Sequence, residues 1–128
     1  LGISNLNLFT EVIKKKESYF SDFLPQSELK QDTHDFLLKV RDKNKIILVS
    51  KCREKRAQSV LKYHGIECLF NNFYFLEELL ESGSKNKFEG ALRKFNIDPS
   101  KVIVIENEDI EIKSAMKAGI SRDKIFKV

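Results

Sequence analysis

The sequence has few of the residues that mark several large classes of protein. Its 128 residues include 5 glycines and 2 prolines, which excludes collagen-like chains and proline-rich linkers. Cys52 and Cys68 have no second Cys or His pair at zinc-ligand spacing, so we expect reduced thiols and no structural zinc. No apolar run approaches the roughly 20 residues that span a bilayer, and the first ten residues lack a secretory-signal pattern. We therefore expect a cytoplasmic protein with no membrane partner.

Apolar and charged residues are both abundant. Hydrophobic residues make up 41% of the chain and charged residues 33%, a balance typical of a packed domain with a solvated surface. The net charge of +4 comes from 23 Lys and Arg that are interspersed with 19 Asp and Glu. Because the basic residues do not gather in one region, we expect no nucleic-acid partner. We predict one domain over residues 1–128.

Two helices are predicted in the first third of the chain. Apolar residues recur at helical spacing over residues 6–23, and Pro25 then ends the helix or lies in the turn after it. A second helix is predicted over about residues 27–42. We expect residues 1–43 to form a helical N-terminal part of the domain.

Strands and helices alternate over the rest of the chain. Residues 46–49 and 102–105 are continuous apolar runs, which suit strands covered on both faces of a parallel sheet. Helices are predicted over residues 53–63, 73–81, 88–95 and 110–118, and shorter strands over 66–70 and 125–128. This alternation predicts an α/β core over residues 44–128 with a mainly parallel sheet.

Two loops of this sheet carry candidate ligand-binding residues, because ligands of open parallel sheets bind beyond the carboxyl ends of the strands. Ser50 and Lys51 follow the first strand and precede a helix, an arrangement that suits a phosphate. Taken alone, Ser50 is more simply explained as a helix N-cap. Glu106, Asn107 and Glu111 follow the second strand and offer oxygen ligands for Mg²⁺. Acidic residues also favour the first turn of a helix for purely structural reasons, so both interpretations stay open.

A third candidate is a lysine in the segment that opens the helix between these loops. Lys85 or Lys87 would reach a bound anion or a carboxylate at the edge of the sheet. Two lysines that are two positions apart do not both face inward on a helix, and solvated lysines are the structural alternative.

The order of these parts resembles the haloacid dehalogenase-like (HAD) superfamily of hydrolases. Residues 46–50 resemble its second motif, an apolar strand ending in a phosphate-binding Ser or Thr. Lys85, or as a second choice Lys87, resembles the lysine of its third motif. Residues 102–120 resemble its fourth motif, which carries acidic residues for Mg²⁺. The resemblance implies a three-layer, Rossmann-like α/β sandwich.

The resemblance also implies a function, that of a Mg²⁺-dependent phosphatase of small phosphorylated substrates. In that interpretation Ser50, Lys51 and Lys85 hold the phosphoryl group. The metal would be held by Glu106, Asn107 and Glu111.

Two departures from the family pattern bear on activity. Family members open with a strand that carries Asp-x-Asp, which supplies the nucleophile and the general acid/base. No such motif precedes Ser50, and Asn107 stands where an acidic residue is common. We therefore expect little or no turnover from the chain as it stands. The alternatives are a non-catalytic HAD-like scaffold that binds a partner or a phosphorylated ligand, and an unrelated doubly wound domain.

The absent Asp-x-Asp strand has a structural consequence. If the strand itself were missing, the sheet would lack its centre, and residues 1–43 would include remnants of the cap that many relatives insert. Another chain, an oligomer or a rearranged N-terminal segment would then have to cover the unpaired strands.

Overall fold

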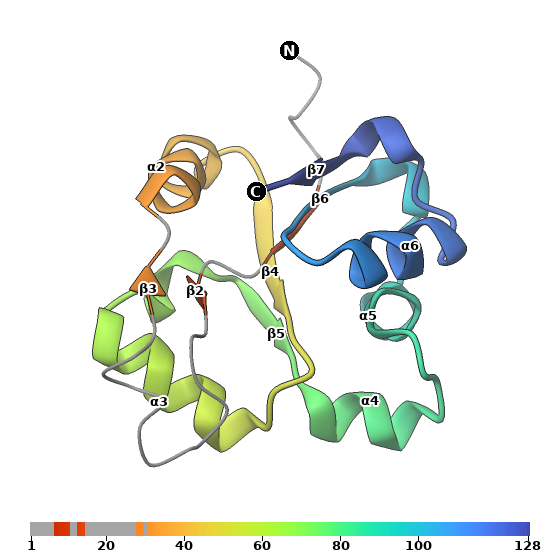
Figure 1. The fold of residues 1–128 in the computed structure, drawn as a ribbon, viewed down its shortest axis with the longest axis horizontal. Coiled ribbons are helices and arrows are strands. Elements are labelled where there is room, and N and C mark those ends of the chain that lie inside the picture. Colours follow the sequence, from red (N-terminus) through yellow and green to blue (C-terminus); the bar gives the residue numbers. More distant parts are fainter. Residues whose placement is uncertain (1–6, 11–12, 15–27, 30) are drawn as a thin grey trace.

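Five strands form the main sheet, in the order β5-β4-β1-β6-β7, and every neighbouring pair is parallel (Figure 1). The computed structural model describes residues 7–10, 13–14, 28–29 and 31–128. The strands of this sheet are β1 (Asn7–Thr10), β4 (Lys45–Val49), β5 (Asn72–Tyr74), β6 (Val102–Glu106) and β7 (Ile125–Lys127). A separate antiparallel pair consists of β2 (Ile13–Lys14) and β3 (Glu28–Leu29).

Helices cover both faces of the main sheet, which makes the three layers expected from the sequence (Figure 1). The helices are α2 (Gln31–Val40), α3 (Glu54–His64), α4 (Leu76–Ser82), α5 (Lys87–Phe95) and α6 (Asp109–Lys117). Short 3-10 turns lie at Glu67–Leu69, Pro99–Lys101 and Arg122–Lys124. No helix among the described residues is long and apolar enough to cross a membrane.

Two apolar cores lie on opposite faces of the sheet. In β4, Ile47 and Val49 belong to the core under α4, α5 and α6, whereas Ile46 and Leu48 belong to the core under α2 and α3. Alternate side chains of a strand point to opposite faces, so a strand buried on both faces must be apolar at every position. This explains the continuous apolar runs of β4 and β6 and confirms the prediction of an α/β sandwich.

The N-terminal segment supplies the central strand of the sheet. β1 lies between β4 and β6, and its last residue, Thr10, stands opposite Leu48 and Ile105. The predicted helix over residues 6–23 is therefore wrong at Asn7–Thr10 and at Ile13–Lys14, which are strands. A short apolar run fits a helix and a strand equally well. Here the segment is a strand because it pairs with β4 on one side and β6 on the other. The N-terminal segment, one of the alternatives considered for this position, therefore fills the centre of the sheet.

Other boundaries also differ from the predictions. The helix expected over residues 27–42 begins only at Gln31, because Glu28–Leu29 forms β3. The strand expected over residues 66–70 is a 3-10 turn, and β5 starts later, at Asn72. The predicted helices over 53–63, 88–95 and 110–118 are confirmed by α3, α5 and α6. Pro25 and the end of the first predicted helix lie outside the described residues.

Candidate ligand site at the carboxyl edge of the sheet

Ser50 lies directly beyond β4 and turns the loop that follows. It is buried, its amide donates to the Tyr74 carbonyl at 2.9 Å, and its hydroxyl accepts from the Cys52 amide at 3.1 Å. The N-cap of α3 is Arg53, which makes no side-chain capping bond. Ser50 therefore shapes the loop and does not cap the helix.

The start of α3 already holds a carboxylate from another helix. The Glu54 amide donates to Glu77 Oε1 at 2.9 Å, and Arg53 lies 3.9 Å from the other oxygen of Glu77. The hydrogen bond from the Glu54 amide holds the pKa of Glu77 below its ordinary value. Because α4 supplies this anion, the Glu54 amide is not open to a phosphate.

Lys87 is the lysine that the structure brings to the edge of the sheet. It is the first residue of α5 and is 2% exposed, and its Nζ lies 3.0 Å from Glu106 Oε1 at the end of β6. Lys85 is exposed. The sequence favoured Lys85, and nothing in the helical spacing distinguished the two positions.

Asn86 explains why Lys87 faces inward. Its side-chain oxygen accepts from the Phe88 and Glu89 amides at 3.0 and 3.1 Å, so it is the N-cap of α5. Its Nδ2 also donates to the Ser114 carbonyl of α6 at 2.7 Å. The cap fixes where α5 begins, and hence which lysine faces the sheet. Sequence analysis missed Asn86, although an Asn directly before a helix is an ordinary cap signal.

We expect Asn86→Ala to lower the free energy of unfolding by about 1–2 kcal/mol, because one change removes the cap of α5 and its bond to α6. Urea unfolding followed by circular dichroism measures the change. Lys85→Ala, one position away and exposed, is the matched control and is expected to stay within about 0.5 kcal/mol of the parent chain. Equal unfolding energies for the two variants would contradict the capping role.

Two buried carboxylates face this edge, and each has a lysine. Glu106 is 2% exposed, and its Oε2 accepts from the Asn107 and Glu108 amides at 3.0 and 3.4 Å while Oε1 accepts from Lys87. Glu111 is 6% exposed, and its Oε2 lies 3.1 Å from Nζ of Lys51, a half-exposed side chain. Its Oε1 is buried and has no hydrogen-bond partner among the described residues.

The described residues alone do not fit Mg²⁺, which the family resemblance implies. Mg²⁺ needs anionic oxygens in a near-octahedral shell, but Glu106 and Glu111 are each neutralised by a lysine. Asn107 offers only an uncharged oxygen. Within the described part of the chain, no group of three or more His, Cys, Asp or Glu residues could hold a metal ion. The three predicted metal ligands therefore do not form a metal site by themselves.

The end of the central strand is the position that sequence reasoning missed. β1 lies between the strands that carry Ser50 and Glu106, and after it the sequence reads Thr10-Glu11-Val12. No aspartate stands there. The two apolar residues before Thr10 were the sequence signal for this strand, but they were interpreted as part of the helix predicted over residues 6–23. The early aspartates do not replace it, because Asp32 and Asp35 are exposed on α2 and Asp22 lies outside the described residues.

The order of strand, serine, lysine and acidic loop, now placed on one edge of a parallel sheet, matches a known family. The family model for haloacid dehalogenase-like hydrolases covers residues 2–123. The chain belongs to this family. The match includes β1, so the central strand is part of the family's fold even though the aspartates are absent.

Solved structures of HAD proteins share this fold. A HAD family enzyme from Bacteroides thetaiotaomicron, in complex with magnesium and inorganic phosphate, is 22% identical with a TM-score of 0.64 over 88% of this chain and 61% of its own. L-2-haloacid dehalogenase from Xanthobacter autotrophicus is 13% identical with a TM-score of 0.68, over 84% and 43%. A haloacid dehalogenase-like hydrolase from Streptococcus pneumoniae is 18% identical with a TM-score of 0.61, over 77% and 46%.

These solved structures are similar to the chain over only part of their own length. The HAD chain spans about half the length of similar solved structures, with 47%, 46% and 58% of their chains covered. At identities of 22% and below, they establish the fold. No curated protein sequence matched the chain.

Proposed function

We propose that this HAD-like domain binds a small phosphorylated ligand at the carboxyl edge of its sheet, through Lys51, Lys87 and the loop at Ser50. The observation that carries the proposal is the inward lysine of α5, Lys87, held at 3.0 Å by Glu106 at the end of β6. Lys51 reaches the same edge from the loop after β4 and keeps about half of its side chain exposed. Ammonium groups beside a phosphate make hydrogen bonds that are stronger than neutral ones.

The proposed function is binding, with little or no hydrolysis by the chain as given. Covalent phosphoryl transfer needs a carboxylate at the end of the central strand to accept the phosphoryl group, and a second one to protonate the leaving oxygen. The chain has Thr10 and Val12 at these two sequence positions. Support for the proposal comes from the place of β1 in the sheet, which leaves no other strand to carry those carboxylates between β4 and β6.

Phosphate binding is proposed to be independent of Mg²⁺. The HAD relative from Bacteroides thetaiotaomicron was crystallised with magnesium and phosphate. Phosphate binding by this chain is therefore to be measured both with and without Mg²⁺. In this chain, Lys51 and Lys87 already neutralise Glu111 and Glu106. A divalent cation would have to displace these two ammonium groups from the carboxylates, so we propose that phosphate binds without it.

Calorimetric titration with inorganic phosphate tests this site. We expect Lys51→Ala to weaken phosphate binding about tenfold or more, since a bond to a charged group is worth roughly 1.5–3 kcal/mol. Lys85→Ala is the matched control and should leave the affinity unchanged. Because Lys51→Ala also leaves Glu111 unpaired, the double variant Lys51→Ala/Glu111→Gln is included. The double variant should bind phosphate as weakly as Lys51→Ala does. That result would show that the loss of affinity comes from the missing lysine and not from the unpaired Glu111.

Two further outcomes would overturn the proposal. One is binding that requires Mg²⁺ and disappears in EDTA, which would mean that the chain holds the phosphate through a metal ion. The other is release of nitrophenol from p-nitrophenyl phosphate above the buffer rate, rising with Mg²⁺. The proposal also includes neither nucleic acid nor membrane as a partner. We propose no partner chain at the centre of the sheet, where β1 lies.

A further inference from the structure

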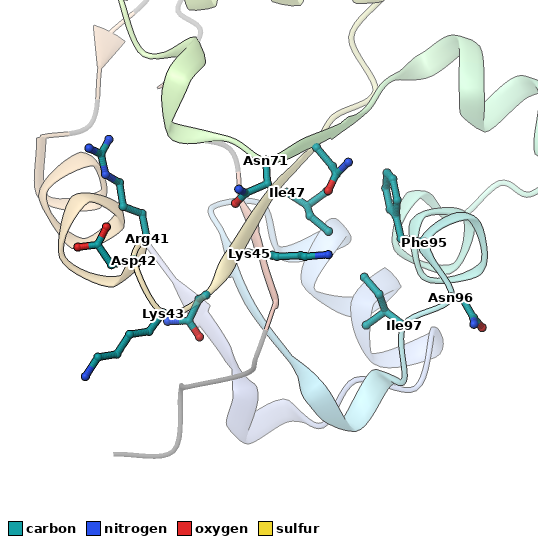
Figure 2. Close-up of a pocket in the computed structure, with 11 residues that line it drawn as sticks. Arg41, Asp42, Lys43, Lys45, Ile47, Asn71, Phe95, Asn96 and Ile97 are labelled. Atoms are coloured by element: carbon teal, nitrogen blue, oxygen red, sulfur yellow. The ribbon is translucent and has the colours of Figure 1, made fainter.

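A hollow of about 760 Å³ lies at the amino edge of the sheet, at the opposite ends of the strands from the site described above (Figure 2). Its lining comes from the loop after α2, the starts of β4 and β5, and the end of α5. Sites for small organic ligands usually measure roughly 300–1,000 Å³. The hollow is thus large enough for such a ligand.

One wall of the hollow is apolar and carries an aromatic ring. Ile47, Phe95 and Ile97 line it, and Phe95 and Ile97 are only partly buried. The Phe95 ring packs edge-on against the Tyr74 ring, with centroids 6.4 Å apart and an interplanar angle of 70°. This contact holds the Phe95 ring in place, and a fixed, partly exposed ring is a surface on which a planar ligand can stack.

Positive charge surrounds the same hollow. Lys45, Arg41 and Lys43 contribute three cations against the single carboxylate of Asp42. Within the described residues, none of these three cations has a salt bridge. Figure 2 shows the Lys45 side chain reaching from the start of β4 toward Phe95 and Ile97, whereas the other charged residues lie on the α2 side of β4. An anionic group on the ligand would therefore find a cation next to the apolar wall.

A buried amide supplies a second, independent sign of a ligand. Asn44 lines the hollow and is 7% exposed. Its Nδ2 donates to the Val40 carbonyl at 3.0 Å, but its Oδ1 is buried and has no hydrogen-bond partner among the described residues. Buried polar atoms are nearly always paired, so this oxygen calls for an N–H or O–H donor. The Asn72 and Asn96 amides line the same hollow.

We propose that this hollow, lined by Asn44, Lys45 and Phe95, is a binding site for a nucleoside monophosphate. The base stacks on the ring of Phe95, in the hollow that the asparagine amides also line. The phosphate pairs with Lys45, the cation that reaches toward Phe95. Inorganic phosphate lacks the ring and a nucleoside lacks the charge, so neither satisfies the whole site.

Titration of the full chain with adenosine monophosphate tests this site. We expect saturable binding that Lys45→Ala weakens about tenfold, the loss of one charge-assisted contact. Phe95→Leu keeps an apolar side chain but removes the ring. It should weaken the affinity for adenosine monophosphate about fivefold or more, because base stacking is lost. Lys85→Ala is the control for a general loss of positive charge and should bind as the parent chain does. Unfolding midpoints of all variants establish that they are folded.

The same titration separates this site from the one at the carboxyl edge. Lys51→Ala should keep its affinity for adenosine monophosphate while losing affinity for inorganic phosphate, and Lys45→Ala should do the reverse. No saturable binding of the nucleotide by the parent chain would overturn the inference. Equal binding by the parent chain, Lys45→Ala and Phe95→Leu would overturn it as well. A nucleotide affinity lost in Lys51→Ala and kept in Lys45→Ala would place the ligand at the carboxyl edge.

Discussion

Lys87→Met is expected to lower the free energy of unfolding by about 3–5 kcal/mol, the range for removing one partner of a buried ion pair. Lys87 and Glu106 are each 2% exposed, and their charged atoms lie 3.0 Å apart. Methionine fills much of the lysine's volume, so packing changes little. The loss comes from leaving the Glu106 carboxylate charged and buried without its partner.

A double-mutant cycle isolates this electrostatic contribution. Glu106→Gln alone leaves Lys87 charged and buried, so it should also destabilise the fold strongly. The double variant Lys87→Met/Glu106→Gln has neither of these two buried charges, and its glutamine oxygen can still accept from the Asn107 and Glu108 amides. We expect a coupling energy of about 2 kcal/mol or more from urea unfolding curves with unchanged slopes. Additive losses would show that the two charges do not depend on each other.

Gly90→Ala is expected to destabilise the protein by about 1–2 kcal/mol, although alanine in a helix is ordinarily better than glycine by up to about 1 kcal/mol. Gly90 lies inside α5, where the helix crosses the ring of Tyr74 in β5. A Cβ on Gly90 would meet the Tyr74 hydroxyl and lie 2.8 Å from ring carbon Cζ. Tyr74 is 1% exposed and belongs to the core, so a shift of its ring would disturb the residues packed around it. Overpacking of this kind typically costs about 1–3 kcal/mol.

Tyr74→Phe provides the matched background for this substitution. Phenylalanine removes the hydroxyl but keeps the ring, so Gly90→Ala should be less harmful there than in the parent chain. Tyr74→Phe alone should have a small effect, because the hydroxyl's bond to the Glu78 carbonyl is long, at 3.5 Å. Thermal unfolding of the four chains measures the cycle. A stabilising Gly90→Ala in both backgrounds would show that helix propensity outweighs the contact.

Local sequence patterns were sufficient for the elements with long or uniform signals. The continuous apolar runs of β4 and β6 identified strands buried on both faces, because only such strands need apolar residues at every position. The helices α3, α5 and α6 could also be predicted, because the spacing of apolar residues within each segment is enough to indicate a helix. Together they placed Ser50 and Glu106 at strand ends, and therefore on one edge of a parallel sheet.

Only the tertiary structure decided the centre of the sheet. Asn7–Thr10 is four residues long, and so short a segment has no period that separates a helix from a strand. Its state depends on hydrogen bonds to β4 and β6, which follow it by more than 30 and 90 residues in the chain. The same placement shows that the strand is present and that Thr10 ends it, which the sequence alone had left open.

The choice between two lysines was also tertiary. Lys85 and Lys87 have similar sequence surroundings, and the contacts that separate them come from distant residues, since Asn86 bonds to Ser114 and Lys87 to Glu106. The hollow around Lys45 arises in the same way, from segments near residues 44, 72 and 96. By itself, the sequence determined which residues are apolar, charged or able to cap a helix. Which of them meet depends on packing between segments far apart in the chain, and local periodicity carries no information about that.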